Sequence, residues 1–351
     1  MSLISFYPGP SRINSQVPRF IEEAYEQGIL SMNHRSDEFM NLMSSTKKSL
    51  SDKLNIPSDY QIVFVSSATE CWEVFAQSCT QGTSQHLYNG AFGEKWAKVA
   101  ESIGRNTIRT QFDLNETIPY NTISADAEWI CLTHCETSNG SYIDDNTLRK
   151  VHEQAAETLI AVDATATMGG LNIDFRLADY WFASVQKCFG LPAGLAVLIV
   201  SDRAVKKATA IGEMNHYNSL LNMLAHSGNN QTHYTPNALN IFLLFKTLSK
   251  SKGIEKIEEK LRERMNRYEL LIAQHSNIKW LLDNPALRSP TVLAITHHAV
   301  DDLKLAAKQN GLVLGNGYGQ WKHNSFRIAN YPSIKKKEID RLETFLMSFK
   351  S

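Results

Sequence analysis

The stretch TLIAVD (158–163) decides the fold, together with the two apolar runs that follow it, ADYWFAS (178–184) and GLAVLIV (194–200). Two earlier runs, QIVFVS (61–66) and AEWICLT (127–133), have the same character. All five are continuously apolar rather than alternating in polarity, which is typical of strands covered on both faces. We therefore expect them to form one buried sheet.

Helical patterns separate several of these runs, at 69–79, 92–103 and 145–157. Strands that alternate with helices are joined by right-handed crossovers, and such chains form mainly parallel sheets. The region from about residue 60 to 200 therefore predicts a large domain of the α/β class with a mainly parallel sheet.

The sequence changes character after Pro236, where helical patterns follow at 237–249 and 253–275. In the second of these, apolar residues recur every three or four positions, which indicates one buried helix face. These residues are Ile254, Ile257, Leu261, Met265 and Tyr268. We place a hinge near 236–255, between the large domain and a second one.

The second domain is predicted to be a smaller α+β unit. Strand-like runs occur at 291–296 and 325–330, and a last helical pattern covers 334–349. GNGYG (315–319) indicates a turn between strands, because no helical pattern begins there. We expect a large domain over residues 16–245, and a small C-terminal domain over residues 246–351 that also includes residues 1–15.

Composition narrows the classes of partner. The 351 residues correspond to roughly two domains, and Lys+Arg and Asp+Glu both number 36. Balanced charge gives no bulk attraction to nucleic acid or to an anionic membrane. The longest apolar runs are far shorter than the ~20 residues that span a bilayer, and no secretory signal is visible. We expect a cytoplasmic protein with no nucleic-acid or membrane partner.

The five cysteines predict free thiols in a reducing compartment, because they are odd in number and scattered along the chain. Cys131 and Cys135 flank His134, a spacing that raises the question of a metal site. A structural zinc site needs four ligands, and no second Cys/His pair with suitable spacing follows. We therefore expect no metal.

Two features at strand ends point to ligand binding. SSATE (66–70) directly follows one predicted strand and precedes a helix, where backbone N–H groups and the helix N-terminus favour a phosphate. The same residue types are also ordinary helix caps. Asp163 closes the strand TLIAVD, and the carboxyl ends of strands are where open α/β sheets bind ligands.

Two cations complete the set. Lys187 in SVQKCFG (184–190) lies between two apolar strands, where an unused charge would be costly to desolvate and where a lowered pKa suits Schiff-base chemistry. Arg327, on a predicted strand, has the fork that matches a carboxylate. A phosphate cradle, an acid, an amine and a carboxylate clamp together predict a pyridoxal-phosphate site.

The chain resembles the class V aminotransferases of the fold type I pyridoxal-phosphate superfamily, most closely the phosphoserine aminotransferases. The resemblance extends nearly from end to end, and the pattern around Lys187 is its most specific part. The matching motifs are YPGPS (7–11), NHRSDEF (33–39), FVSSATECWE (64–73), NGAFGEKW (89–96), HCETSNG (134–140), VDATAT (162–167), SVQKCFGLPAGL (184–195), HYTPNAL (233–239) and FRIANYP (326–332).

This resemblance implies that Lys187 forms the Schiff base with pyridoxal 5'-phosphate and that Asp163 contacts its pyridine nitrogen. Phe92 stands where the family usually has an aromatic residue, often Trp, stacked on the cofactor ring. Thr137 would hydrogen-bond near the cofactor hydroxyl.

The cofactor phosphate is implied to be held by Thr69, by the backbone amide of Glu70 and by the side chain of Gln186. Tyr234 and Thr235 match a pair that reaches the same phosphate from the partner subunit, which implies a homodimer with shared active sites. The family usually has Asn at the position of Tyr234.

His34, Arg35 and Arg327 match the residues that bind the anionic groups of the substrate. The chain departs from the family at Glu70, which stands at the position of an Arg that helps to hold the substrate phosphate. Exchanging a cation for an acid weakens the match to a dianionic substrate. His34 and Arg35 are two basic residues that remain to bind it.

The implied function is transamination between glutamate and 3-phosphohydroxypyruvate, giving phosphoserine in serine biosynthesis. The alternative is a class V transaminase acting on alanine or serine with glyoxylate or pyruvate. A lyase or cysteine desulfurase is disfavoured, because no cysteine follows Cys188 to act as its nucleophile. A non-catalytic nucleotide-binding protein is disfavoured by the joint presence of Lys187, Asp163 and Gln186.

Overall fold

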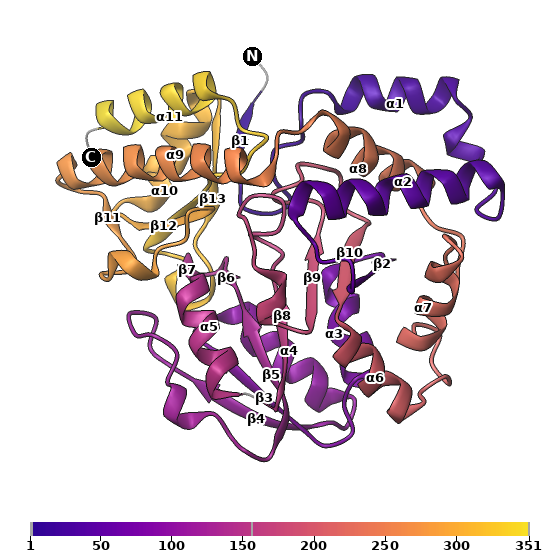
Figure 1. Ribbon diagram of the computed structural model, residues 1–351. Helices are drawn as coiled ribbons and strands as arrows, with labels where there is room; N and C mark the ends of the chain where they lie inside the picture. The colour runs from indigo at the N-terminus through magenta and orange to yellow at the C-terminus, as the bar shows by residue number, and fades with distance from the viewer. Residues whose placement is uncertain (1–2, 156, 350–351) are drawn as a thin grey trace.

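The computed structural model describes residues 3–155 and 157–349 (Figure 1). A seven-stranded sheet forms its centre, with the strand order β2-β10-β9-β8-β5-β3-β4. The strands are β2 (Gln61–Val65), β3 (Thr83–Tyr88), β4 (Asn106–Gln111), β5 (Ala127–Thr133), β8 (Leu159–Asp163), β9 (Tyr180–Ser184) and β10 (Ala196–Val200). The pairs from β9 to β4 are parallel, and β10 runs antiparallel to both of its neighbours.

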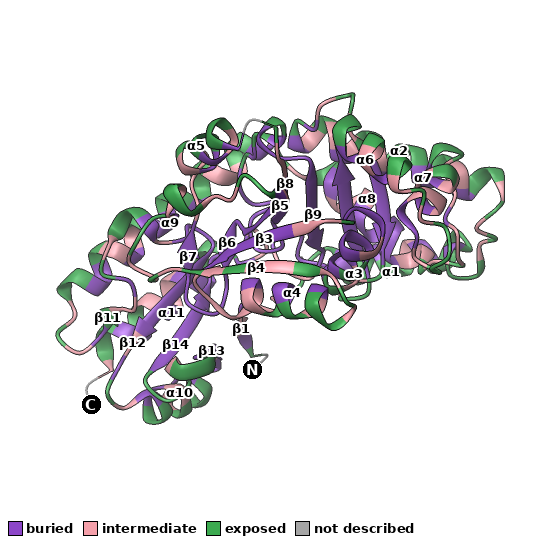
Figure 2. Cartoon of the chain, turned by 90° about the horizontal axis from the view of Figure 1, so that it is seen from below, coloured by how far each residue is buried: buried purple, intermediate pink, exposed green. Residues whose placement is uncertain are grey.

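Helices cover both faces of this sheet, and the strands are buried between them (Figure 2). One face packs against α1 (Val17–Glu26), α2 (Asp37–Leu54), α5 (Asp145–Gln154) and α8 (Ala238–Lys250). The other packs against α3 (Ala68–Ser78), α4 (Ala91–Ser102), α6 (Asp202–Ile211) and α7 (Leu220–Gly228). This two-sided cover explains why the strands read as continuous apolar runs.

A second sheet has the order β1-β13-β14-β12-β11. Its strands are β1 (Ile4–Phe6), β11 (Lys279–Trp280), β12 (Val292–Thr296), β13 (Leu312–Asn316) and β14 (Ser325–Ala329), and its core includes residues of α9 (Ile254–Gln274), α10 (Val300–Gln309) and α11 (Lys336–Ser348). β1 pairs with β13 in parallel, so the beginning of the chain belongs to this sheet. A small hairpin of β6 (Cys135–Glu136) and β7 (Ser141–Tyr142) packs against the same core.

The predicted fold class is confirmed: a large α/β unit with a mainly parallel sheet is followed by a smaller α+β unit. The domain boundaries at 15/16 and 245/246 stay a prediction. The helix expected at 145–157 ends at Gln154, and residue 156 lies outside the described residues. Within the described ranges, no helix is both long and apolar enough to cross a bilayer.

Two strands of the large sheet were not expected from the sequence, because both are rich in polar residues. β4 is an edge strand with no fully buried residue, which permits its polar sequence NTIRTQ. β3 is buried, and its polar side chains are paired inside the sheet layer. Gln85 donates to the Thr110 hydroxyl and the Thr122 carbonyl, and Ser84 is hydrogen-bonded to His86.

One strand departs from the parallel majority. β10 is antiparallel to β9, in a sheet that the sequence predicted to be mainly parallel. The connection over 185–195 contains no helix and is too short for the crossover that parallel neighbours require. This tight connection holds Lys187 at the edge of the sheet, beside the ends of β8 and β9.

Candidate active site

A cavity of about 470 Å³ lies at the carboxyl ends of the parallel strands, and we call it the strand-end cavity. Thr133, Asp163 and Ser184 close β5, β8 and β9 on its floor. Its opposite wall comes from the second sheet and from the connection between β13 and β14, through residues 316–319, Lys322 and Arg327. The cavity therefore lies between the two sheets, at the edge where open α/β sheets bind ligands.

The Lys187 amine is deep within this cavity. Its Nζ donates to Thr137 Oγ1 at 3.2 Å and lies 5.3 Å from the centroid of the Phe92 ring. A Cβ added to Gly9 would lie 3.3 Å from Lys187 Cε, so glycine gives the lysine chain its room. Burial lowers the pKa of Lys187, and the charge of Asp163 acts in the opposite direction. A lowered pKa makes a neutral, nucleophilic amine more accessible.

Asp163 is only 6% exposed, and its Oδ1 accepts a hydrogen bond from the Thr165 amide at 2.9 Å. Burial raises the pKa of Asp163, while contacts with Thr165 and the charge of Lys187 act to lower it. A positively charged ring nitrogen in the cavity would lower the pKa of Asp163 further. The carboxyl is therefore placed to form an ion pair with a cationic ligand atom.

Phe92 forms one wall, and a buried carboxylate fixes its position. Glu136 Oε2 accepts hydrogen bonds from the backbone amides of Phe92 and Gly93, at 3.0 and 3.2 Å, at the start of α4. Its Oε1 accepts from the amide and hydroxyl of Ser138. A Cβ on Gly90 would come within 2.2 Å of Glu136 Cγ, so only glycine fits there. The carboxylate thus occupies the N-terminus of α4 and orients the aromatic ring.

Arg327 is 5% exposed and is held by two backbone carbonyls. Its Nε donates to Asn316 O at 2.6 Å and its Nη1 to Thr137 O at 2.5 Å. Nη2 has no hydrogen bond within the described part of the chain. Burial lowers the pKa of Arg327, an effect that a bound carboxylate would offset.

The start of α3 forms another part of the wall. Ser67 caps the helix by accepting from the Glu70 amide at 3.1 Å, and the Ala68 amide donates to Ser184 Oγ at 2.9 Å. Thr69 lines the cavity, whereas Glu70 does not. The Glu70 carboxylate instead accepts from the amide of Ser66, at 2.8 Å, and from its hydroxyl.

Seven of the residues predicted for the site lie together in the strand-end cavity: Thr69, Phe92, Thr137, Asp163, Gln186, Lys187 and Arg327. Five others do not line it: His34, Arg35, Glu70, Tyr234 and Thr235. The Arg35 guanidinium donates to Gln231 Oε1 at 2.6 Å, which joins the loop of His34 and Arg35 to the segment of Tyr234 and Thr235. These residues are exposed or half-buried, so they form a surface outside the chain's own cavity.

Sequence reasoning missed several lining residues. Trp72 lies one turn into α3, and Tyr318 and Lys322 come from the GNGYG turn and the residues after it. The Tyr318 ring packs on Phe92, with centroids 5.6 Å apart. The turn between β13 and β14 is confirmed, and its position across the cavity is what the sequence could not show. Tyr7, from the YPGPS opening, lines the same wall.

The implied cofactor fits this cavity. Thr133 Oγ1 and Gln186 Oε1 are buried there without a hydrogen-bond partner among the described residues, so polar positions for a ligand are left open. An amine, a buried carboxyl, an aromatic wall and a helix N-terminus correspond to the aldehyde, ring nitrogen, ring face and phosphate of pyridoxal phosphate.

The comparisons with known proteins agree with this geometry. Residues 6–319 match the family model described as Aminotransferase class-V. The phosphoserine aminotransferase of Rhodococcus opacus is 27% identical to this chain, over 95% of this chain and 91% of the relative. A crystal structure of a phosphoserine aminotransferase from Cytophaga hutchinsonii is 31% identical, covers 98% of both chains and has a TM-score of 0.95.

A more distant structure shows how far the fold extends. An alanine–glyoxylate aminotransferase from a Nostoc species is 17% identical and has a TM-score of 0.83, with 99% of this chain and 94% of that chain covered. At that identity the likeness concerns the fold alone. Substrate choice therefore has to be argued from the residues around the cavity.

Proposed function

This chain belongs to the class V aminotransferases and is a pyridoxal-phosphate-dependent enzyme, and from that premise we propose that it transfers an amino group between glutamate and 3-phosphohydroxypyruvate. The observation that carries the proposal is the convergence of Lys187, Asp163 and Arg327 on one cavity. The relatives named phosphoserine aminotransferase support the choice of substrate.

In this proposal the groups of the cavity have separate tasks. The Lys187 amine would hold the cofactor and would also act as the general base for the proton on the substrate Cα. The Asp163 carboxylate would hold a proton on the ring nitrogen. Phe92 would pack against the ring, and Thr137 would donate near its hydroxyl. When bound, the cofactor supplies an electron sink for the charge that develops at Cα.

Arg327 is proposed to bind the substrate α-carboxylate. Its Nε and Nη1 are committed to carbonyls, so the side chain reaches the cavity already oriented. Such preorganisation lowers the entropy lost when substrate binds. Thr69 and Gln186 are proposed to hold the cofactor phosphate, helped by the N-terminus of α3. The Glu70 amide is proposed for the same phosphate, although it donates to Ser67 Oγ in this chain.

We propose a homodimer in which one chain completes the cavity of the other. Tyr234 and Thr235 would contact the partner's cofactor phosphate, and His34 and Arg35 would contact the side-chain anion of its substrate. The Arg35–Gln231 hydrogen bond supports this, because it brings both groups of residues to one surface of the same chain. The five cysteines are free and buried, which suits the reducing cytoplasm in which we propose that the enzyme works.

The Glu70 carboxylate bears on the alternative substrates. It pairs with Ser66 and turns away from the cavity of its own chain, so its repulsion of a substrate phosphate there is reduced. The loss of an Arg at this position is what would favour an acceptor without a phosphate, such as pyruvate or glyoxylate. The choice of substrate therefore depends on whether the charge of Arg35 compensates for the Arg that Glu70 replaces.

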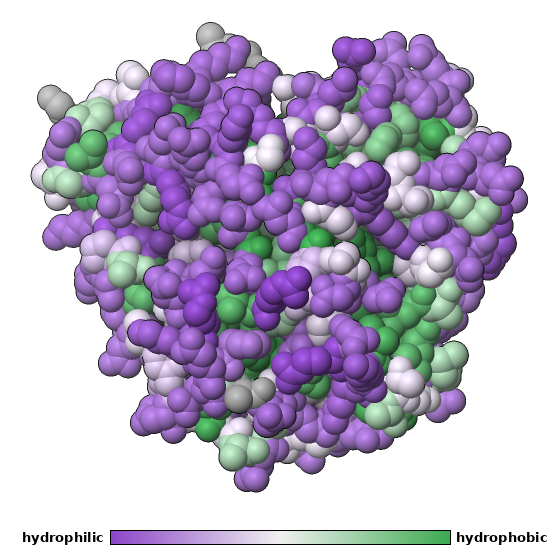
Figure 3. Space-filling view, viewed as in Figure 1, coloured by the Kyte–Doolittle hydropathy of each residue, from purple (hydrophilic) through white to green (hydrophobic). Residues whose placement is uncertain are grey.

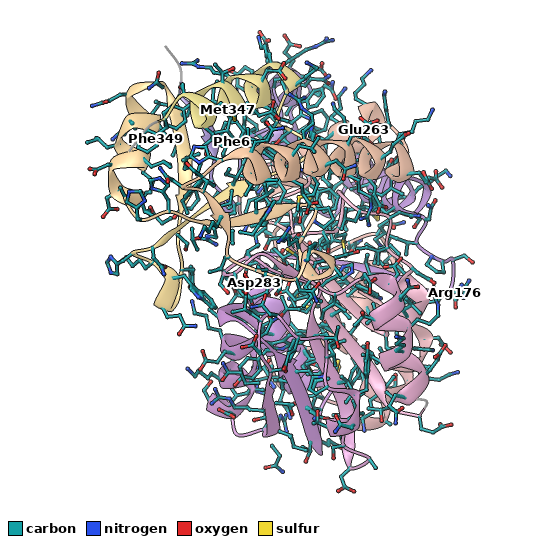
Figure 4. All side chains as sticks on the ribbon, turned by 90° about the vertical axis from the view of Figure 1, so that its left-hand side faces the viewer. Phe6, Arg176, Glu263, Asp283, Met347 and Phe349 are labelled. Atoms are coloured by element: carbon teal, nitrogen blue, oxygen red, sulfur yellow. The ribbon has the colours of Figure 1, made fainter. Side chains whose placement is uncertain are left out.

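The test is kcat/KM with glutamate as donor and 3-phosphohydroxypyruvate, pyruvate or glyoxylate as acceptor. We expect the phosphorylated acceptor to be preferred, and we expect Arg35→Ala to raise its KM far more than that of pyruvate. Arg176→Ala is the matched control, because Arg176 is exposed and does not line the cavity; Figure 4 labels it at the margin of the molecule. A preference for pyruvate or glyoxylate in the unmodified enzyme would overturn the proposed substrate and leave the family unchanged.

A further inference from the structure

A second cavity, of about 670 Å³, lies where the chain passes from the first core to the second, and we call it the hinge cavity. The ends of α2 and α8 and the beginning of α9 form its walls. Cys188 and Phe189 also line it, so the residue after Lys187 faces a different cavity from Lys187 itself. Its volume falls within the ~300–1,000 Å³ of small-molecule sites.

Five lysines line the hinge cavity: Lys53, Lys250, Lys252, Lys256 and Lys260. The Lys53 amine donates to Ser251 O at 2.8 Å. The other four have no ion pair or hydrogen bond with any residue that the structure describes. In Figure 3 the upper outline is notched between the α9 side and the α2–α8 side, and hydrophilic residues form the rim.

The surrounding charges reinforce this positive field. The Arg264 guanidinium is buried nearby and donates to the carbonyls of Tyr331 and Ile334. Burial lowers the pKa of Lys260, the charges of Arg264 and Lys252 lower it further, and the charge of Glu263 acts in the opposite direction. Like charges that repel one another in this way favour an anion that can lie between them.

The acids close to this cavity do not neutralise it. Glu259 and Glu263 are its two acidic lining residues, and both are exposed (Figure 4 labels Glu263 on α9). Glu255 and Glu258 on the same helix are already bonded elsewhere, to Asn55 and to Arg262. Five lysines against two acids leave a net positive wall, and the N-terminus of α9 adds to it.

Besides the lysines, the hinge cavity has an unpaired polar atom and an apolar floor, which indicate what else a ligand would carry. The hydroxyl of Thr247, a lining residue, is buried without a hydrogen-bond partner in the described ranges. Leu54, Phe189 and Leu261 form an apolar floor below the lysines. Such a floor suits a ring, whereas flexible lysines suit phosphate oxygens.

We propose that the hinge cavity binds an organic polyphosphate, an anion with two or more phosphate groups and an apolar ring. The ligand bridges Lys250 at the end of α8 and Lys256 and Lys260 on α9, so it joins the helices on either side of the predicted hinge. It binds apart from the substrate and stabilises one arrangement of the two cores. This site is independent of the transaminase chemistry proposed above.

Calorimetric titration of the holoenzyme tests the site with three probes: ATP without metal, inorganic triphosphate, and adenosine. We expect ATP to bind most tightly, triphosphate more weakly and adenosine not at all. Added ATP should also raise the Tm, because a ligand that binds only the folded state stabilises it. Failure of the wild-type enzyme to bind ATP, or equal affinities for ATP and triphosphate, would overturn the assignment.

Three variants assign the binding to this cavity. Lys256→Gln/Lys260→Gln should weaken ATP binding at least tenfold and remove the Tm shift. Lys150→Gln/Lys308→Gln removes the same charge from exposed positions outside both cavities and should bind like the wild type. Lys322→Gln, in the strand-end cavity, should also keep ATP binding. The proposal would be refuted if Lys322→Gln lost ATP binding, or if Lys256→Gln/Lys260→Gln bound ATP as tightly as the wild type.

Discussion

Lys187 and Cys188 are neighbours in the chain, yet they line two cavities that differ in how their charged side chains are held. In the strand-end cavity the two cations of the proposed chemistry are held: Lys187 by Thr137, and Arg327 by two backbone carbonyls. In the hinge cavity four of the five lysines have no partner among the described residues. Fixed groups suit a reaction that needs one geometry, whereas free cations suit a ligand held mainly by charge.

The largest effect is expected at the amine itself. Lys187→Ala should abolish turnover and remove the visible absorption of the bound cofactor, because only a primary amine can form the covalent link. The fold should persist, since the substitution removes a buried cation and no core side chain. Steady-state assay, absorption spectrum and Tm check all three points, and residual turnover at the wild-type rate would show that another group supplies the amine.

Asp163→Asn should lower kcat by about 10²–10⁴-fold while the enzyme still binds its cofactor. The amide keeps the shape of the side chain but cannot carry the negative charge that faces the ring nitrogen. Rapid kinetics and cofactor content measured on the same preparation separate lost chemistry from lost binding. A rate close to wild type would remove Asp163 from that role.

Much of the strand-end cavity could be predicted because its residues lie in short motifs at strand ends. Asp163 ends an apolar run, and Lys187 lies in a tight connection between two others. The polar strand β3 could not be found this way, since its buried groups are satisfied by partners far along the chain, such as Thr110 and Thr122. Propensity and periodicity carry no signal for such long-range pairing.

The hinge cavity was not predicted, for a related reason. Its lysines come from α2, the end of α8 and the start of α9, and each alone reads as a solvated surface charge. Tyr318 in the strand-end cavity is similar, because GNGYG predicted only a turn. Sequence patterns locate residues along an element, whereas these sites depend on how distant elements meet.

Arg327→Lys tests whether fixed geometry matters beyond charge. Lysine keeps the cation but cannot bond both carbonyls and the substrate together. We expect kcat/KM to fall by about 10- to 100-fold, the equivalent of one or two charged hydrogen bonds, mainly through KM. Steady-state kinetics for donor and acceptor give the answer, and an unchanged KM for both would exclude Arg327 as the carboxylate clamp.

The buried His134, directly after β5, should make the stability of the protein depend on pH. Burial lowers the pKa of His134 from its usual 6.5 to about 4. Between these values the unfolded chain binds the proton more readily, so protonation favours unfolding and stability falls as pH decreases from 6.5 to 4. The full effect is about 3 kcal/mol for a shift of this size. The free energy of unfolding, measured with urea across this pH range, should depend less steeply on pH in His134→Asn than in the wild type. The exposed His298→Asn should keep the wild-type pH dependence.

The smallest effect is expected in the hinge cavity, and its sign is informative. Lys260 is exposed and has no partner in the described chain, so Lys260→Gln breaks no hydrogen bond or ion pair. It does remove a charge that Arg264 and Lys252 repel and that Glu263 attracts more weakly. Without ligand, the free energy of unfolding should therefore rise slightly, within about 0.5 kcal/mol, with kcat and KM unchanged. Urea unfolding at low and high salt checks the cause, because screening should reduce the gain. A clear loss of stability would mean that Lys260 supports the fold, whereas a small gain shows that this cation is kept at a cost that only a bound anion offsets.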